Sequence, residues 1–209
     1  MSREAILQRV RTALGRTGGA PPPPPAVRIR IPEVAVDDRI ASLRAKVEAL
    51  AGKTLLAGSP AEAREYVANV IAARTAVASN APVLAEWGIA ALPGVSTGFY
   101  DREELRVACA AADFGITAAD YALADTGTLV MFSSQEEARL ISLLPPVHLA
   151  LVPRERILTG LDELLTLHPQ PMDRSCSMVL ITGPSRTADI EQILVRGVHG
   201  PGEIHVVVV

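Results

Sequence analysis

The feature that most constrains the fold is the alternation of helical and strand-like hydrophobic patterns from Asp37 to the end of the chain. Ile40, Leu43 and Val47 are spaced three and four residues apart, which is typical of one face of a helix. Short, largely apolar runs alternate with such helical stretches at residues 54–57, 76–78, 128–132, 147–152, 177–182 and 205–209. The runs at 147–152 and 177–182 predict strands buried on both faces. This order of elements predicts an α/β fold.

A short amphipathic helix is predicted at the N-terminus, where Ile6, Leu7, Val10 and Leu14 form an apolar stripe. The prolines at 21–25 favour a stiff polyproline spacer after it. An isolated helix of this length is marginal in water, so its stripe needs a surface. A partner, a second copy of the chain or the chain's own domain are the alternatives. We divide the chain into a helical arm at 1–16, a Gly/Pro-rich linker at 17–36 and an α/β domain at 37–209.

Composition excludes several classes of function. The chain has 20 Lys and Arg against 23 Asp and Glu, a formal net charge of -3, and 3% aromatic residues. It therefore lacks the positive charge and the rings that nucleic-acid binding requires. Cys109 and Cys176 are isolated, so we expect no disulfide, zinc or iron–sulfur site and a reducing cytoplasm. We also expect no membrane span and no secretory signal, because apolar runs are short and charged residues interrupt residues 1–16.

Two short motifs resemble known patterns but lack the required context. Gly52-Lys53-Thr54 resembles the end of a phosphate-binding loop, yet it lies between a helix and a strand and is better interpreted as a helix C-cap. The segment 94–98 (GVSTG) fits the G-x-S-x-G pattern of serine hydrolases, but the next helix starts only near Asp101. We interpret it as a loop beside a ligand pocket.

A loop that follows the run at 177–182 has the residue types of an anion site. Gly183 allows close backbone approach, Ser185 or Thr187 can cap a helix suggested by Ile190, Ile193 and Leu194, and Arg186 supplies a guanidinium. Free amides at a helix start attract carboxylate or phosphate. The alternative is a plain strand-to-helix connection with a surface arginine.

Two other segments contribute candidate residues. The turn Asp125-Thr126-Gly127 separates two hydrophobic runs and predicts a tight turn between strands. The segment 197–202 (GVHGPG) is rich in glycine, and its His199 and Gly200 could meet a ligand, His199 as a donor, acceptor or proton carrier. The alternative for His199 is a hydrogen bond to backbone in a tight turn. His148 is interpreted as a core histidine, with a ligand role as the alternative.

Four sequence blocks, in order along the chain, resemble the lactate-utilisation protein C family, which carries the LUD domain. They are residues 118–130 (AADYALADTGTLV), 143–148 (LLPPVH), 182–191 (TGPSRTADIE) and 197–201 (GVHGP). The first half of the domain is similar only in its order of elements and in the loop at 94–100. The resemblance implies a mostly parallel central sheet with helices on both faces, similar to the superfamily of ribose-5-phosphate isomerase and coenzyme A transferases.

The resemblance also implies a role but no reaction. It points to a cofactor-free component of an iron–sulfur system that oxidises L-lactate, with clusters only in partner subunits. The positions that match the family's motifs, and that we take as candidate ligand-binding residues, are Asp125, Thr126, Gly127, Gly183, Ser185, Arg186, Thr187, His199 and Gly200.

The leading hypothesis is therefore a small-anion-binding accessory subunit that works with iron–sulfur partners. One alternative is a stand-alone enzyme acting on a sugar phosphate or acyl-coenzyme A, for which Asp125 or Glu136 would supply the carboxylate. Another is a structural scaffold in which the loops serve folding alone.

Overall fold

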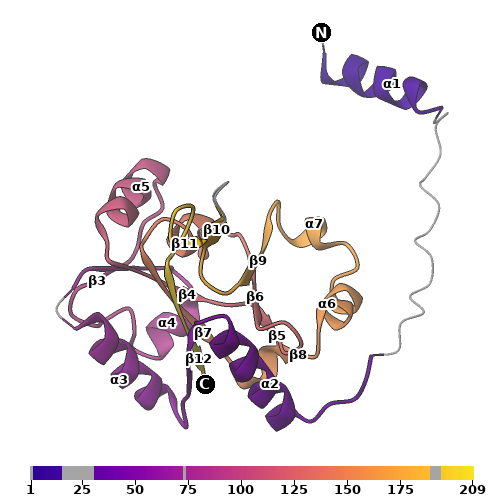
Figure 1. The fold of residues 1–209 in the computed structure, drawn as a ribbon. Coiled ribbons are helices and arrows are strands. Elements are labelled where there is room, and N and C mark those ends of the chain that lie inside the picture. The colour runs from indigo at the N-terminus through magenta and orange to yellow at the C-terminus, as the bar shows by residue number, and fades with distance from the viewer. Residues whose placement is uncertain (1, 16–30, 73, 189–193) are drawn as a thin grey trace. The chain divides into compact units, whose positions relative to one another are not determined.

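The computed structural model describes residues 2–15, 31–72, 74–188 and 194–209, and its contacts divide the chain into the units Met1–Arg30 and Ile31–Val209 (Figure 1). In the first unit the predicted helix is confirmed as α1 (Arg3–Ala13), which Ser2 caps by accepting a hydrogen bond from the Ala5 amide. Ile6, Val10 and Leu14 are exposed. Most of the predicted linker lies outside the described residues.

The second unit alternates helices and strands as predicted. Its helices are α2 (Val36–Ala49), α3 (Pro60–Ile71), α4 (Pro82–Glu86), α5 (Arg102–Ala111), η1 (Arg139–Ser142), η2 (Arg154–Arg156), α6 (Leu161–Leu167) and α7 (Pro171–Arg174). Its strands are β1 (Lys53–Leu56), β2 (Ala76–Ala78), β3 (Val95–Ser96), β4 (Phe114–Ala118), β5 (Tyr121–Leu123), β6 (Thr128–Phe132), β7 (Val147–Val152), β8 (Ile157–Leu158), β9 (Met178–Thr182), β10 (Arg186–Ala188), β11 (Leu194–Arg196) and β12 (Glu203–Val208).

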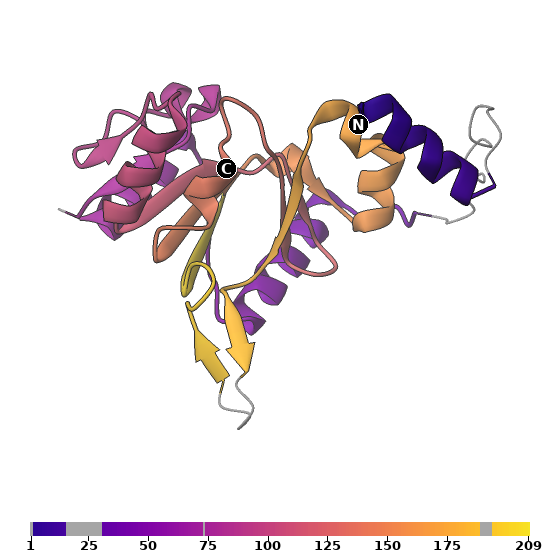
Figure 2. The same cartoon turned by 90° about the horizontal axis from the view of Figure 1, so that it is seen from above.

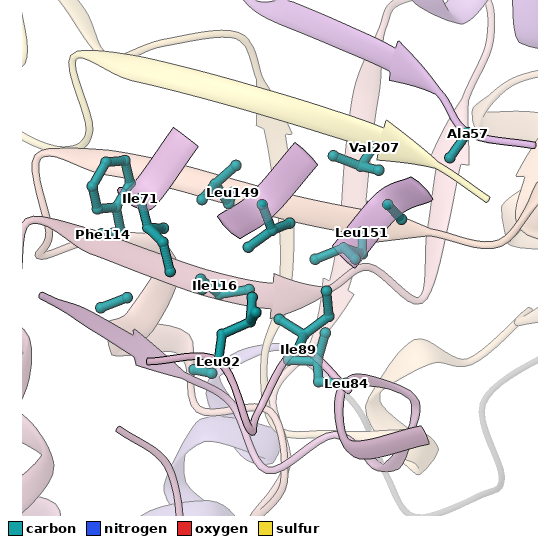
Figure 3. Packing of buried hydrophobic residues seen from close by; sticks show 14 residues of the cluster. Ala57, Ile71, Leu84, Ile89, Leu92, Phe114, Ile116, Leu149, Leu151 and Val207 are labelled. Carbon is teal, nitrogen blue, oxygen red and sulfur yellow. The ribbon is translucent and has the colours of Figure 1, made fainter. Parts of the chain in front are cut away.

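A six-stranded parallel sheet in the order β1-β12-β7-β4-β2-β3 forms the centre of this unit. Because side chains alternate along each strand, the sheet buries two faces. On one face α3 and α4 cover Phe114, Ile116 and Leu149, which are at most 1% exposed (Figure 3). The α/β class with a mostly parallel central sheet is confirmed.

The opposite face of the sheet is covered by helices and by a second sheet. Helix α2 packs Leu43 and Val47 against Val206 of β12, and α5 packs Cys109 against Val77 of β2. A four-stranded sheet in the order β8-β5-β6-β9 lies on the same side, and its far face packs on α6 (Figure 2). Two β layers therefore lie between the helical layers, and a pocket can form where they diverge.

Two local predictions are wrong. Residues 178–182 do form a strand, but β9 lies at the edge of the second sheet with Leu180 43% exposed, so it is not buried on both faces. No helix is present at Leu194, because β10 and β11 pair as an antiparallel hairpin with Thr187 opposite Val195. The residues 189–193 between these strands lie outside the described part of the chain. Among the described residues, no helix has the length and hydropathy needed to cross a membrane.

Candidate functional site

Two of the three predicted loops meet in one pocket of about 310 Å³, which we name the loop pocket. It lies between the strand β9 and the amino ends of β7 and β12, where His148 and Ile204 are the second residues of their strands. Its described lining residues are Ser142, Leu143, His148, Val179, Leu180, Ile181, Thr182, Gly183, Pro184, Ser185, Arg186, His199, Gly200, Pro201 and Ile204.

Backbone hydrogen bonds hold these two loops together. The Ser185 amide donates to the Pro201 carbonyl at 2.8 Å, and the Gly197 amide donates to the Ser185 carbonyl at 3.0 Å. The Gly202 amide then donates to the Pro146 carbonyl just before β7. Gly183 has a φ of +76° and packs against Leu50, which favours glycine at this position. The pocket mouth is therefore built from fixed backbone rather than from a helix N-terminus.

Arg186 lines the pocket and also contacts α2. Its Nη2 atom donates a hydrogen bond to the carbonyl of Leu50, the C-cap residue of that helix. A guanidinium at a helix C-terminus is favourable because the unpaired carbonyls there carry partial negative charge. One N–H group of the guanidinium is used by Leu50, and no other hydrogen bond joins it to a described residue. Thr187 lies beside Arg186 in β10 and is absent from the pocket lining.

Two histidines border the pocket in different environments. His199 is exposed. His148 is 1% exposed, and its Nε2 atom lies 2.7 Å from the Thr117 hydroxyl. Its Nδ1 atom is buried without a hydrogen-bond partner among the described residues. Burial lowers the pKa of His148 to about 4, so the ring is neutral at physiological pH. His148 is therefore buried, as predicted, and it also lines the loop pocket.

The third predicted segment, Asp125-Thr126-Gly127, lies outside the loop pocket. It forms the turn between β5 and β6, as predicted, and Gly127 (φ +73°) packs against Lys46 and Val47 of α2. The Thr126 hydroxyl donates to Asp125 and accepts from Thr128. All of these hydrogen bonds are within the turn and its strand.

Among the described lining residues of the loop pocket, Arg186 carries the permanent charge, and this charge is positive. Its described lining contains Arg186 and two histidines, and it contains no Asp or Glu. A small anion therefore meets a guanidinium, a hydroxyl on Ser185 and ring nitrogens, and none of the described lining residues is a carboxylate that would repel it. The apolar remainder suits a ligand with a small hydrocarbon part.

Sequence analysis missed Glu137, a buried carboxyl group that lines a different cavity. The available signal was its position in a Ser-rich segment directly after the hydrophobic run 128–132. Glu136, which the stand-alone enzyme hypothesis proposes as a catalytic carboxylate, lines that second cavity as well. Its Oε2 atom accepts a hydrogen bond from the Ser134 hydroxyl. The two cysteines differ in environment. Burial raises the pKa of the Cys109 thiol to about 11, and Cys176 is exposed. The described residues include no group of three His, Cys, Asp or Glu placed to hold a metal.

The fold and pocket define a class: an α/β protein with a pocket between its two sheets. The family model for the LUD domain matches residues 40–209. The chain is 34% identical over 155 residues to lactate utilization protein C of Halalkalibacterium halodurans, which covers 67% of this chain and 64% of that protein. It is 32% identical over 162 residues to the lactate utilization protein C of Anoxybacillus flavithermus. This match covers 71% of this chain and 70% of that protein.

This chain belongs to the LUD domain family. The match spans somewhat less than two thirds of the length of the Halalkalibacterium relative and 39% of the Bacillus subtilis lactate utilization protein C, to which it is 40% identical over 94 residues. The crystal structure of a DUF162 family protein from Deinococcus radiodurans superposes with a TM-score of 0.63 at 17% identity, covering 84% of this chain and 99% of that one. This likeness confirms the fold.

Proposed function

We propose that this protein takes part in lactate utilisation in the cytoplasm, as a subunit without its own cluster that binds a small carboxylate in the loop pocket and works with iron–sulfur partners. The names of its relatives support the lactate role. The isolated cysteines support the placement of clusters in other subunits. The observation that carries ligand binding is the loop pocket's lining of Arg186, His148 and His199, with no carboxylate among the lining residues that the structure describes.

L-lactate suits this pocket chemically. Its carboxylate would bind the Arg186 guanidinium, its hydroxyl has Ser185 and the histidine nitrogens as partners, and its methyl group would contact apolar side chains such as Ile204. Pyruvate presents the same carboxylate and methyl group.

A melting experiment with matched ligands tests the proposal. L-lactate should raise the melting temperature, because a ligand that binds the native state stabilises it. L-lactamide, which keeps the shape but lacks the charge, should not. Arg186→Gln should weaken lactate binding roughly tenfold or more, as expected for a lost hydrogen bond to a charged group.

Thr187→Val is the matched control, because Thr187 neighbours Arg186 in the strand but does not line the pocket. This variant should bind lactate like the wild-type protein. Equal stabilisation by lactate and lactamide, or equal losses in both variants, would contradict an anion site in the loop pocket.

A further inference from the structure

A second cavity, of about 680 Å³, lies at the carboxyl ends of the parallel strands, and we name it the edge cavity. It is bordered by Ala118 at the end of β4, by Pro153 after β7 and by Ala81 after β2. In the strand order, the next strand along the chain after β2 is its neighbour β3 on one side. The next strand of this sheet after β4 is β7, which lies on the opposite side. The connections from β2 and β4 therefore run in opposite directions across the sheet. Open α/β sheets bind ligands outside the carboxyl ends of strands at such a reversal.

Glu137 bridges the two strands that flank this reversal. Its Oε2 atom accepts a hydrogen bond from the hydroxyl of Ser79, which follows β2, at 2.8 Å. The same atom accepts from the Ala118 amide at 3.2 Å. The loop that presents Glu137 is fixed, since the Asn80 amide donates to the Glu136 carbonyl and the Ser134 hydroxyl accepts from the Glu137 amide.

One oxygen of this carboxyl group has no partner. Glu137 is 7% exposed, and its Oε1 atom is buried without a hydrogen bond from any described residue. Burial raises the pKa of Glu137 to about 8, against the lowering effect of the Ser79 and Ala118 hydrogen bonds. The group is therefore protonated at neutral pH. Because Oε2 accepts both hydrogen bonds, Oε1 carries the proton and requires an acceptor.

The other charges around the edge cavity determine what can enter it. The titratable and charged residues in its described lining, besides Glu137, are Glu86, Asp120, Glu136, Glu155, Arg156 and Arg174. Arg174 pairs with Asp120, and Arg156 donates to the Tyr121 hydroxyl at 3.3 Å. No ion pair within the described part of the chain neutralises Glu86, Glu136 or Glu155. The remaining carboxylates repel a phosphate but accept hydrogen bonds from hydroxyl groups.

We propose that the edge cavity is a second binding site, for an uncharged polyhydroxylated carbonyl compound, and that Glu137 Oε1 donates a hydrogen bond to the ligand's carbonyl oxygen. The ligand's hydroxyl groups are held by the carboxylates and by the serine hydroxyls of the lining. This site is separate from the loop pocket and does not rest on the proposed lactate role. A protein that fails to bind lactate can still bind here.

Three small probes test the ligand class by ligand-observed NMR on the full chain. Dihydroxyacetone carries the carbonyl and the hydroxyl groups, glycerol lacks the carbonyl, and dihydroxyacetone phosphate adds the charge. Dihydroxyacetone should bind most tightly of the three. Tighter binding of the phosphate by the Arg186→Gln protein, whose loop pocket lacks its guanidinium, would overturn the proposal. No binding of dihydroxyacetone to protein with native melting behaviour would overturn it as well.

The pH profile tests the role of Glu137. Binding of dihydroxyacetone should be about tenfold weaker at pH 9 than at pH 7, because the donor proton is lost as Glu137 ionises. Glu137→Gln retains a donor that cannot ionise, so its binding should not change over this range. Glu136→Gln, at the neighbouring position in the same cavity, removes one of the carboxylates that accept from the ligand's hydroxyl groups, so its affinity should be lower at both pH values. The tenfold ratio between pH 7 and pH 9 should remain, because Glu137 is intact. A flat wild-type profile would show that Glu137 does not contact the ligand, whether or not the Glu137→Gln variant folds.

Discussion

At the scale of single residues, burial shifts the pKa values of Glu137 and His148 in opposite directions for one physical reason. Burial disfavours the charged form of any group, so it raises the pKa of Glu137 and lowers that of His148. Each residue also has one buried polar atom without a partner among the described residues. Such groups cost stability unless a ligand or another group satisfies them. Both residues border cavities, which makes them the most informative positions to change.

Glu137 should make the stability of the protein depend on pH. Both states are protonated below the ordinary value of 4.5, and the folded group ionises only near 8. As pH rises between these values the unfolded chain loses its proton first, so stability should fall by roughly 1.4 kcal/mol per pH unit and then level off.

Urea unfolding at pH 5 and pH 8 checks this prediction. Glu137→Gln has no proton to lose at this position. The free energy of unfolding of this variant, relative to that of the wild-type protein, should therefore rise by several kcal/mol, up to about 4 kcal/mol, when the pH is raised from 5 to 8. Glu136→Gln corrects for general pH effects. A difference between wild type and Glu137→Gln that stays constant with pH would contradict the account.

At the scale of elements, the sequence predicts what depends on local periodicity and misses what depends on pairing partners. The runs at 128–132 and 147–152 match β6 and β7, because their hydrophobicity reflects burial in any sheet. The spacing of Ile190, Ile193 and Leu194 favoured a helix, yet Leu194 lies in a strand that pairs with β10. Strand pairing is a tertiary contact that can override local propensity.

The turn Asp125-Thr126-Gly127 illustrates the same limit for the candidate site. Its residues match a family motif, but in the structure Gly127 is required by packing, because an added Cβ would lie 2.8 Å from the Cβ of Lys46 and 2.9 Å from the Val47 amide. Gly127→Ala should therefore destabilise the protein by about 2 kcal/mol or more, from backbone strain and from the clash together.

Gly98→Ala isolates the backbone part of this cost. Gly98 has a φ of +85°, and no atom of the described residues, apart from its immediate chain neighbours, lies within 4 Å of its added Cβ. Denaturant unfolding should show a loss of about 1 kcal/mol for this variant, which is smaller than the loss for Gly127→Ala. Lactate affinity of the folded Gly127→Ala protein should match that of the wild type. Equal losses of unfolding free energy in the two variants would contradict a packing role for Gly127.

At the scale of the whole molecule, the charges separate two cavities with different chemistry. The loop pocket could be predicted in part, because its Gly, Ser, Arg and His residues lie in two short motifs of the C-terminal half. The edge cavity could not, because Ser79, Ala118 and Glu137 become neighbours only through the strand order β7-β4-β2. Local patterns in a sequence do not specify which strands lie next to each other.

The division of contacts between Arg30 and Ile31 leads to a prediction about the arm. Deletion of residues 1–30 should leave the melting temperature of the α/β domain unchanged, because residues 31–209 form a compact unit by themselves. The exposed stripe of Ile6, Val10 and Leu14 should instead serve assembly, so the deletion should reduce co-purification with iron–sulfur partner subunits. Unchanged co-purification would remove the arm from the proposed role.

The most direct test of a carboxylate site between the two loops is a titration of ¹⁵N-labelled protein with L-lactate, followed by amide chemical shifts. The account predicts saturable shifts centred on the amides of Gly183, Ser185 and Gly200 in the loop pocket. Shifts centred instead on residues 118–120 and 137, around the edge cavity, would contradict it, as would the absence of saturable shifts anywhere.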